Sequence, residues 1–335
     1  MKLGNIRLSN NLILAPMQNV TTGPYRRFCR NISKEIGLVS IPMLYTKRIV
    51  QKPESVEKDL IKIEGEHPIS LQLIGSNVND LKKSIEFLES YKFDVLDLNA
   101  GCPSKRALYA KEGGFLMKEF KTLNNLIKSA VKYSSKPVSI KIRSGYSNNF
   151  DINEFASILN DSNVQFVTIH GRTVKERYQD SKIDYEFIKK LKLALQIPLI
   201  GNGDIFSPED AGFFIDKTGV DGLMIGRGCI GFPEIFSQVN KHLSNIGVDP
   251  FQNNLIKMKK YIEIYEGIVD EFLNKGVNLG YPNEMFKFAE LYRNSIWLSK
   301  GIKNSTEIRR DLSKVKNLNE LKRELESIFA SSEFN

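Results

Sequence analysis

Short apolar segments rich in β-branched residues recur at regular intervals through the first two thirds of the chain. Segments with helical periodicity, such as 78–91 and 123–135, lie between most of them. The apolar segments are LILAPM (12–17), LVSIPM (38–43), ISLQLIG (69–75), VLDLNAG (95–101), VSIKIR (138–143), FVTIHG (166–171), PLIGNG (198–203) and GLMIGRG (222–228). Near-continuous apolar strands of this kind are typical of parallel sheets that are covered on both faces.

The number and order of these segments point to one architecture. Eight strand–helix units over about 230 residues predict a (β/α)₈ barrel, in the α/β class. An open, doubly wound sheet is the alternative, but no glycine-rich turn follows the first apolar segment. We therefore expect a closed barrel of eight parallel strands.

The pattern changes after about residue 245. Strand-like segments give way to long amphipathic stretches, such as 254–276 and 317–329, and Gly247 and Pro250 interrupt the periodicity before them. We predict two domains, a catalytic barrel over residues 1–245 and an all-helical domain over residues 246–335.

Composition narrows the class of protein. Hydrophobic residues make up 41% and charged residues 26% of the 335 positions, and no apolar run approaches the roughly 20 residues that span a bilayer. The N-terminus lacks the features of a secretory signal. Three scattered cysteines fit neither a disulfide framework nor a zinc site. We expect a cytoplasmic protein with no membrane segment and no metal.

The charge distribution leaves two interpretations open. The net charge of +9 favours a polyanionic partner. Segment 287–316 carries eight basic and three acidic residues, with Phe288, Tyr292 and Trp297 interleaved. This segment is either a nucleic-acid face or a solvated helix surface whose aromatic side chains pack inward. The basic residues are Lys287, Arg293, Lys300, Lys303, Arg309, Arg310, Lys314 and Lys316.

Polar side chains stand at the ends of most predicted strands. In a (β/α)₈ barrel, the carboxyl ends of the strands carry the active site. We therefore expect these side chains to converge on one mouth of the barrel. The residues at or just beyond the strand ends are Pro16, Met17, Gln72, Asn99, Cys102, Lys141, Arg143, His170, Arg172, Asn202, Asp204, Gly226 and Arg227.

Two glycine-rich turns follow the last two strands, GNGDIFSPEDA (201–211) and IGRGCIGFPEIF (225–236). Turns of this type let backbone N–H groups approach a phosphate closely, and helix N-termini nearby favour negative charge. Together they predict a phosphorylated cofactor or substrate. The alternative is that the glycines only serve tight turns.

Lys141 is a cation in an otherwise apolar strand, where an unpaired charge is costly. It is suited to a Schiff base, to the electron-rich edge of a flavin, or to a salt bridge with Asp97 of the neighbouring strand. The alternation of Asp97 with Asn99 does not settle which of them faces the barrel interior. His170 is one of three histidines, and its position at a strand end favours ligand contact over a structural role.

In this order, these residues resemble the tRNA-dihydrouridine synthases, a family of flavin enzymes. The matching segments are LAPMQNVTTGPYRRFCR, ISLQLIG, LDLNAGCPSKRALYAKEGG, VSIKIRSG, VTIHGRT, IGNGDI and GLMIGRG, which span nearly all of residues 12–232. The combination is specific although no single motif is. The resemblance implies a (β/α)₈ barrel that holds FMN, followed by a helical domain that helps to grip tRNA.

The resemblance also implies a reaction and residue roles. NADPH reduces FMN, a hydride passes from flavin N5 to C6 of a uracil ring, and Cys102 donates the proton to C5. The target uridine is swung out of its stack. The residues implied to contact FMN are Pro16, Met17, Gln18, Gln72, Lys141 and His170, with Asn202, Gly203, Asp204, Gly226 and Arg227 at the ribityl-phosphate end.

Substrate contacts are expected from a second group of residues. Basic side chains around the mouth are suited to backbone phosphates of tRNA. The residues assigned to the substrate are Asn99, Lys105, Arg106, Arg172 and Arg293. Further basic candidates, some of them ordinary surface charges, are Arg26, Arg27, Lys111, Lys175 and Arg177.

Some positions depart from the family pattern. The family usually has Ala-Gly-Val-Thr-Asp where this chain has residues 18–22, Gln-Asn-Val-Thr-Thr. Beyond His-Gly-Arg-Thr, this chain keeps only Tyr178 and has Val174, Glu176 and Asp180 at the other family positions. The identity of the modified uridine is therefore open. We expect a monomer.

Two other functions share part of this residue pattern. A flavin barrel acting on a small pyrimidine, similar to dihydroorotate dehydrogenase, also places a lysine and an asparagine over FMN. Such enzymes lack the Asn-Ala-Gly-Cys-Pro run at 99–103 and have no use for a basic helical appendix. A non-catalytic RNA-binding barrel has no use for Cys102, Lys141 and the phosphate turns together.

Overall fold

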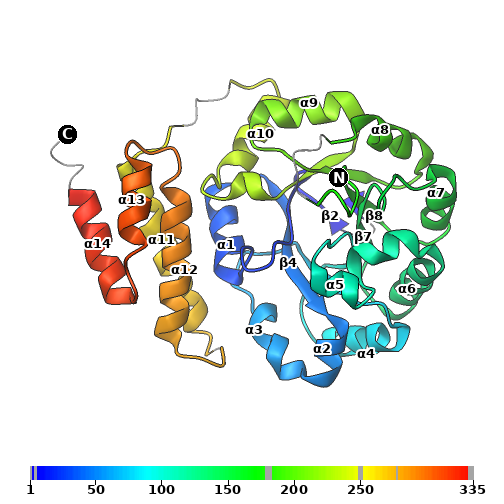
Figure 1. The fold of residues 1–335 in the computed structure, drawn as a ribbon, viewed down its shortest axis with the longest axis horizontal. Helices are drawn as coiled ribbons and strands as arrows, with labels where there is room; N and C mark the ends of the chain where they lie inside the picture. The colour runs from blue at the N-terminus through cyan, green and yellow to red at the C-terminus, as the bar shows by residue number, and fades with distance from the viewer. Residues whose placement is uncertain (1, 4–5, 178–182, 248–251, 277, 331–335) are drawn as a thin grey trace.

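The computed structural model describes residues 2–3, 6–177, 183–247, 252–276 and 278–330 of the chain. Its centre is a closed barrel of eight parallel strands in the order β10-β3-β4-β5-β6-β7-β8-β9 (Figure 1). The barrel strands are β3 (Leu12–Leu14), β4 (Ile36–Tyr45), β5 (Ile69–Ile74), β6 (Val95–Ala100), β7 (Val138–Arg143), β8 (Phe166–His170), β9 (Leu199–Asn202) and β10 (Gly222–Ile225). All eight predicted strands are therefore present, and the predicted (β/α)₈ barrel is confirmed.

Helices surround the barrel between consecutive strands (Figure 1). Many have an N-cap side chain that accepts a hydrogen bond from the first turn, as Asn77, Asp151 and Ser207 do. The helices of this part are α1 (Gly23–Ile32), α2 (Thr46–Gln51), η1 (Pro53–Val56), α3 (Glu57–Leu60), α4 (Val78–Leu88), α5 (Lys105–Tyr109), η2 (Gly113–Lys118), α6 (Phe120–Tyr133), α7 (Ile152–Asn160), α8 (Tyr185–Ala194), α9 (Pro208–Thr218), η3 (Arg227–Cys229) and α10 (Ile235–Leu243).

The interior of the barrel is filled by side chains rather than open. Ile13, Leu38, Phe166 and Met224, from four different strands, belong to one buried cluster. Leu8 joins this cluster just after a short antiparallel pair, β1 (Lys2–Leu3) and β2 (Ile6–Arg7). The packed interior leaves the carboxyl ends of the strands as the place for a cavity.

Four helices follow the barrel and pack as a separate layer against α1 (Figure 1). Their contact with α1 is aromatic: Phe28 meets Tyr261 and Tyr265 edge to face, and Tyr25 meets Trp297 in the same way. The helices are α11 (Leu255–Leu273), α12 (Asn283–Leu298), α13 (Ser305–Leu312) and α14 (Leu318–Ala330). A helical region after the barrel is thus confirmed, and the division at residues 245 and 246 stays a prediction.

Buried charges lie at the contact between the barrel and this helical region and beside it. Arg26 on α1 is 1% exposed and binds Glu66, which is fully buried, at 3.1 Å. Glu290 on α12 accepts a hydrogen bond from Thr22 Oγ1 at 3.1 Å and also binds Tyr265 and Arg293. We call this group of residues the seam. Because Arg26 is buried, its prediction as an RNA-facing residue is wrong.

The aromatic residues of segment 287–316 pack inward. Phe288, Tyr292 and Trp297 are partly buried against the hydrophobic core, as the interpretation with inward aromatic side chains expects, while the nucleic-acid face stays a prediction for the basic side chains alone. Several cations of the segment are paired with acids, as Lys287 is with Glu266 and Asp270. Across the described ranges, every helix is too short or too polar to cross a lipid bilayer.

Candidate active site

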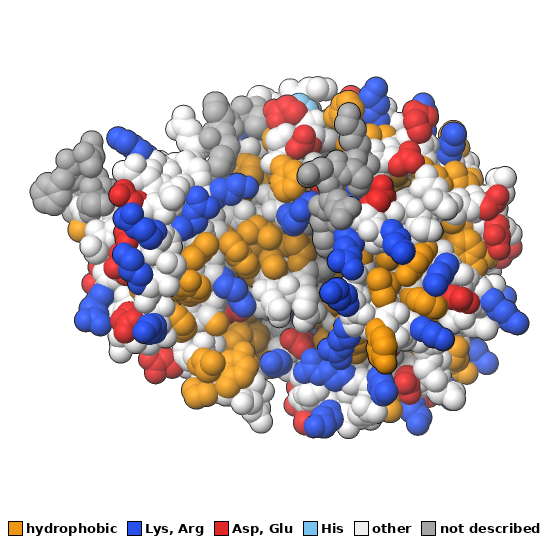
Figure 2. Space-filling view, viewed as in Figure 1, with side chains coloured by type: hydrophobic (Ala, Val, Ile, Leu, Met, Phe, Trp, Pro, Cys, Tyr) orange, Lys and Arg blue, Asp and Glu red, His pale blue; other side chains and the backbone are white. Residues whose placement is uncertain are grey.

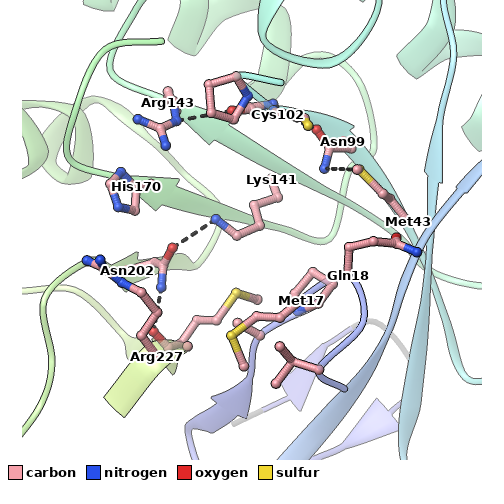
Figure 3. A pocket seen from close by; sticks show the side chains of 18 of the residues that line it. Met17, Gln18, Met43, Asn99, Cys102, Lys141, Arg143, His170, Asn202 and Arg227 are labelled. Carbon is pink, nitrogen blue, oxygen red and sulfur yellow. Dashed lines mark hydrogen bonds between the residues drawn. The ribbon is translucent and has the colours of Figure 1, made fainter. Parts of the chain in front are cut away.

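One large cavity, of about 690 Å³, lies at the carboxyl ends of the barrel strands (Figure 3). Nearly every residue that the sequence placed at the strand ends lines it, which confirms that these side chains converge. Those lining it are Pro16, Met17, Gln18, Gln72, Asn99, Cys102, Lys105, Lys141, Arg143, His170, Asn202, Gly203, Asp204, Gly226 and Arg227.

Cys102 lies in a turn that its neighbours hold from several sides. Asn99 Oδ1 accepts hydrogen bonds from the backbone N–H groups of Gly101 at 3.1 Å and Cys102 at 2.9 Å. The Cys102 thiol donates to Ser104 Oγ at 3.4 Å, and the Cys102 carbonyl accepts from Gly114 N at 3.0 Å. The sulfur is therefore fixed at the cavity wall while the side chain stays half-exposed.

The glycine pair that follows this turn explains the second half of the Cys102 motif. Gly113 has a φ of 57°, a region that glycine adopts most easily. A Cβ on Gly114 would lie 2.8 Å from the Cys102 carbonyl oxygen and 2.8 Å from the methyl groups of Val174. Residues 113–114 thus allow the chain to return closely behind Cys102.

Arg143, at the end of β7, ties the Cys102 turn to the next loop. Its Nε donates to the Gly101 carbonyl at 3.1 Å, and its Nη1 donates to the carbonyls of Thr173 at 2.9 Å and Arg177 at 2.7 Å. The side chain is 3% exposed. Three carbonyl contacts from one rigid guanidinium fix the spacing between the two loops.

Lys141 reaches across the cavity from β7 toward β9 (Figure 3). Its Nζ donates to Asn202 Oδ1 at 2.8 Å, and Asn202 Nδ2 donates to the Met224 carbonyl at 2.7 Å. Burial, together with the nearby Arg143 cation, lowers the pKa of Lys141 to about 8. The expected alternative of a salt bridge between Lys141 and Asp97 is not what the structure shows, since Lys141 hydrogen-bonds a neutral amide.

Asp97 and Asn99 point to the same side of β6 and share a partner. Gln72 Nε2 donates to Asp97 Oδ2 at 2.6 Å, and Asn99 Nδ2 donates to Gln72 Oε1 at 2.7 Å. Ser139 Oγ also donates to Asp97, at 2.6 Å. Burial raises the pKa of the Asp97 carboxyl. This chain of hydrogen bonds orients Asn99, which in turn orients Cys102.

His170 lies 7% exposed at the end of β8, opposite Lys141 in the cavity (Figure 3). Burial and the cations Arg143 and Lys141 hold the pKa of His170 well below its ordinary value. The imidazole is therefore neutral at physiological pH, which suits a hydrogen-bonding role and not that of a cation.

Two arginines meet one carboxylate at another part of the cavity, where Asp204 and Arg227 line the wall and Arg172 is buried beside Asp204. Asp204 binds Arg172 at 2.5 Å and Arg227 at 3.0 Å. The hydrogen bond from Arg172, with the charge of Arg227, lowers the pKa of Asp204. Because two cations meet one anion, the group carries a net positive charge that suits a phosphate.

Most glycines of the last two turns serve close packing: a Cβ on Gly201 would lie 2.2 Å from the Phe214 ring, and one on Gly231 would lie 2.1 Å from the Trp297 carbonyl oxygen. A Cβ on Gly228 would lie 2.1 Å from the Ile205 carbonyl oxygen, so this glycine is required by the approach of the two turns. A Cβ on Gly226 would meet Met17 Sδ and Ala15 Cβ only at ordinary contact distances of 3.5 and 3.6 Å. Tight turns therefore explain Gly228, while Gly226 faces the cavity.

Some predicted residues lie elsewhere. Arg106 does not line the cavity, and its guanidinium stacks on the Tyr45 ring at 4.1 Å. Arg172 does not line the cavity either, and it contacts the cavity residue Asp204. Arg293 belongs to the seam, where it pairs with Glu290. Tyr178 and Asp180 lie outside the described residues.

The cavity also contains residues that sequence reasoning missed. Met43 lies 3.7 Å from Asn99 Nδ2, at a point where the register between β4 and β5 shifts. Ser104 accepts from the Cys102 thiol, and it is also the N-cap of α5. The Cys-Pro-Ser order could have indicated Ser104, whereas no local signal marks Met43. Among the residues that the structure describes, no group of three or more His, Cys, Asp or Glu side chains is placed to hold a metal ion.

Comparison with known proteins agrees with this geometry. The family model described as "Dihydrouridine synthase (Dus)" matches residues 13–333. A probable tRNA-dihydrouridine synthase of Rickettsia bellii is 33% identical over 310 residues, with 92% of this chain and 91% of that protein covered. A tRNA-dihydrouridine synthase B of Vibrio parahaemolyticus is 34% identical over 247 residues, which cover 73% of this chain and 76% of that protein.

A comparison of folds gives the same architecture at lower similarity. Morphinone reductase superposes with a TM-score of 0.51 at 13% identity, over 75% of this chain and 90% of that one. At this identity the likeness concerns the barrel alone. The family match covers almost the whole chain, and it includes the Cys102 turn and the polar strand ends. The chain belongs to the dihydrouridine synthase family.

Proposed function

We propose that this protein reduces uridines in tRNA to dihydrouridine, with FMN as its bound cofactor and NADPH as the electron donor. The observation that carries the proposal is the placement of the Cys102 thiol, the Lys141 ammonium and the Arg172–Asp204–Arg227 group around one cavity of about 690 Å³. Family membership and the names of the relatives support the same reaction.

The residues present fit a flavin mononucleotide. The cavity has the size of a site for a cofactor of this class. Lys141 is a partly buried cation that donates to the neutral amide of Asn202, and it suits the electron-rich edge of an isoalloxazine ring. The net positive charge at Arg172 and Arg227 suits a phosphate. Met17 and Pro16 offer apolar surface.

Bound in this cavity and reduced by NADPH, FMN would supply the hydride for C6 of the uracil ring. The protein has to supply the proton for C5, and the Cys102 thiol is the group placed for this. The turn that Asn99 organises holds Cys102 at the cavity wall. A general acid needs the thiol and not the thiolate, and the Ser104 hydroxyl accepts a hydrogen bond from this thiol.

Lys141 and His170 have different electrostatic roles in the cavity. Lys141 offers positive charge at neutral pH, since its pKa of about 8 keeps most of it protonated. This charge stabilises negative charge that develops in the transition state. His170 stays neutral and offers a hydrogen bond. Asn99, Arg143 and Gln72 are positioning residues, because they hold the Cys102 turn and its supports.

The substrate is placed by the surface around the mouth. Lys105 lines the cavity and is exposed, so it is suited to a backbone phosphate beside a uridine that has left its stack. Arg106 is exposed next to it. Arg293 is committed to Glu290, and its proposed contact with tRNA requires the third of its side chain that remains exposed.

The rival, reduction of a small pyrimidine, is served by the same flavin site. No feature of the described residues favours it, and the Cys102 turn opens beside exposed cations that a small substrate does not require. The two functions separate in one assay: the tRNA reaction yields a mass gain of two hydrogens in tRNA, whereas the rival leaves tRNA unchanged.

The deciding experiment replaces Cys102 with alanine. Loss of a general acid lowers the rate by about 10²- to 10⁴-fold. We expect Cys102→Ala to retain bound FMN and NADPH oxidation while dihydrouridine formation in tRNA, measured by mass spectrometry, falls at least about 100-fold. The matched control is Cys29→Ala, since Cys29 is fully buried on α1 and away from the cavity. Full activity of Cys102→Ala, or a protein that binds no flavin, would refute the proposal.

A further inference from the structure

A second cavity, of about 290 Å³, lies next to the first. It is lined by Leu108, Tyr146, Val174, Lys175 and Arg177. Arg177 lines both cavities. Leu108 belongs to α5, the short helix that begins three residues after Cys102. We call this the flanking cavity, because it shares a rim residue with the proposed active site.

Hydrogen bonds between backbone groups build the walls of the flanking cavity. Val174 N donates to the Gly145 carbonyl at 2.9 Å, and Lys175 N donates to the Tyr146 carbonyl at 2.9 Å. Arg143 Nη1 donates to the Arg177 carbonyl at 2.7 Å. The loops after β7 and β8 are therefore joined to each other and to the Cys102 turn, so the cavity is formed before any ligand arrives.

An aromatic ring surrounded by cations forms one side of this cavity. The Tyr146 ring meets Phe115 edge to face at 6.3 Å. The Lys118 ammonium lies 4.7 Å from the Tyr146 ring centre and 4.3 Å from that of Phe115, and the Lys175 ammonium lies 6.0 Å from that of Tyr146. An aromatic ring with cations over it offers a stacking surface and positive charge together, and proteins bind a single-stranded base and its phosphate with these two features.

The charge around the flanking cavity is mainly positive. Lys118, Lys175 and Arg177 are exposed. Of the acids nearby in the chain, Glu112 is buried and Glu176 accepts hydrogen bonds from Thr173 at 2.6 and 2.8 Å, while Glu119 is exposed beside Lys118. Figure 2 shows Lys and Arg side chains interspersed with hydrophobic ones over the α5 side of the barrel.

We propose that the flanking cavity binds the base of a nucleotide adjacent to the target uridine, with this base on Tyr146 and its phosphate at Lys175 and Arg177. The proposal rests on the proposed function, because it assigns a neighbour of the same substrate. Once a uridine lies in the main cavity, its backbone passes over the shared rim at Arg177. The flanking cavity thereby adds a preference for bases that stack well next to the modified position.

The first test replaces Tyr146 with leucine in the FMN-loaded enzyme. Stacking of one base on an aromatic side chain contributes about 1–3 kcal/mol, so we expect the KM for tRNA to rise about tenfold, with the loss in KM rather than in kcat. Tyr146→Phe keeps the ring and is expected to restore the KM. The matched control is Tyr133→Leu, because Tyr133 on α6 also lies near two lysines, Lys82 and Lys132, but lines neither cavity.

A second test asks which group occupies the flanking cavity. After the modified uridine is mapped, tRNAs with an abasic residue on its 5′ or its 3′ side are compared. We expect one of them to bind the wild-type enzyme about tenfold more weakly and to bind Tyr146→Leu no more weakly than intact tRNA. The proposal would be overturned if the abasic residue weakened tRNA binding equally in the wild type and in Tyr146→Leu. An unchanged KM for tRNA in Tyr146→Leu would also overturn it.

A free nucleotide has the same chemistry as one in RNA, and the kinetics separate the two sources. If Tyr146→Leu raises the KM for NADPH and leaves that for tRNA unchanged, the cavity binds the electron donor and the proposal is wrong. Lys175→Ala, an exposed substitution that does not threaten folding, should lower the salt dependence of tRNA binding by about one counterion. Failure of the proposed function itself would look different, since the wild-type enzyme would form no dihydrouridine.

Discussion

The seam and the main cavity both bury charged side chains, but they treat these charges differently. In the seam, Arg26 is paired with the carboxylate of Glu66, and Glu290 is bound by Thr22, Tyr265 and Arg293. In the cavity, the partly buried ammonium of Lys141 is hydrogen-bonded to the neutral amide of Asn202. The first arrangement satisfies each charge within the protein, whereas the second leaves a charge available to a ligand.

This difference separates groups that hold the fold together from groups that act. A paired buried charge becomes very costly when its partner is removed. A buried cation held by a neutral group already destabilises the fold, and its pKa shows this by falling to about 8. Removal of the cavity cation should therefore harm activity and spare stability, and removal of a seam charge should do the reverse.

The largest effect is expected at the buried pair of the seam. Arg26→Met leaves Glu66 without its cation in a site from which water is excluded, and we expect the free energy of unfolding to fall by about 3–5 kcal/mol in urea titrations. Arg310→Met serves as the control, because Arg310 pairs with Glu307 at the surface with 62% and 60% of the two side chains exposed. Its loss should stay below about 1 kcal/mol. Similar losses for the two variants would contradict the comparison.

Replacement of the cavity cation should give the opposite result. Lys141→Met keeps the length of the side chain and removes its charge, so dihydrouridine formation should fall at least about 100-fold, or roughly 2.7 kcal/mol. The free energy of unfolding of the flavin-free protein should not decrease, because the desolvation of the ammonium is relieved. A variant that unfolds more easily yet stays active would place Lys141 among the structural charges. Lys132→Met on α6 is the surface control.

A milder change in the seam tests whether the carboxylate charge of Glu290 matters. Glu290→Gln keeps the shape of the side chain but removes its charge, which weakens its hydrogen bonds to Tyr265 and Arg293. A hydrogen bond to a charged group contributes about 2 kcal/mol to stability. We expect a loss of that size in thermal or urea unfolding. Thr22→Val removes one neutral donor from the same carboxylate and should cost less. An unchanged stability in Glu290→Gln would show that the seam does not depend on charge.

The smallest effect concerns pH. Lys141 has a pKa of about 8 in the folded protein and an ordinary value of 10.5, so between these values the unfolded chain binds more protons than the folded protein. Stability of the flavin-free wild type should therefore rise with pH relative to Lys141→Met, by about 1 kcal/mol between pH 8 and 9. Below about pH 7 the difference should be flat, because Lys141 is then protonated in both states. A difference that falls as pH rises would reverse the assigned direction.

Local sequence was sufficient for most of the barrel and of the cavity. Each predicted strand is present within a few residues, because an apolar β-branched run carries its own signal wherever it packs. The polar residues at the strand ends converge because parallel strands of a barrel share one carboxyl edge. Lys141, Asn202 and Cys102 could therefore be assigned to one site before any contact was known.

Other features could not be predicted because their partners are distant in the chain. Thr22 and Glu290 are 268 positions apart, and nothing near either residue indicates the other. Arg26 and Arg293 were expected at the RNA surface because they are basic, but each meets a carboxylate that only packing brings close. The sequence pattern around a basic residue does not distinguish an exposed side chain from one that is buried and paired.

The sequence by itself determined the strand order, the mouth of the barrel and the kinds of chemical group gathered there, since these depend on periodicity and on residue type. Only the tertiary structure decided which charges are satisfied and which remain for a ligand. It also decided that Asn99 holds the Cys102 turn, and that Tyr146 and Arg177 form a cavity beside it. The reason is physical: burial and pairing energies depend on distances between segments, and a sequence pattern does not contain those distances.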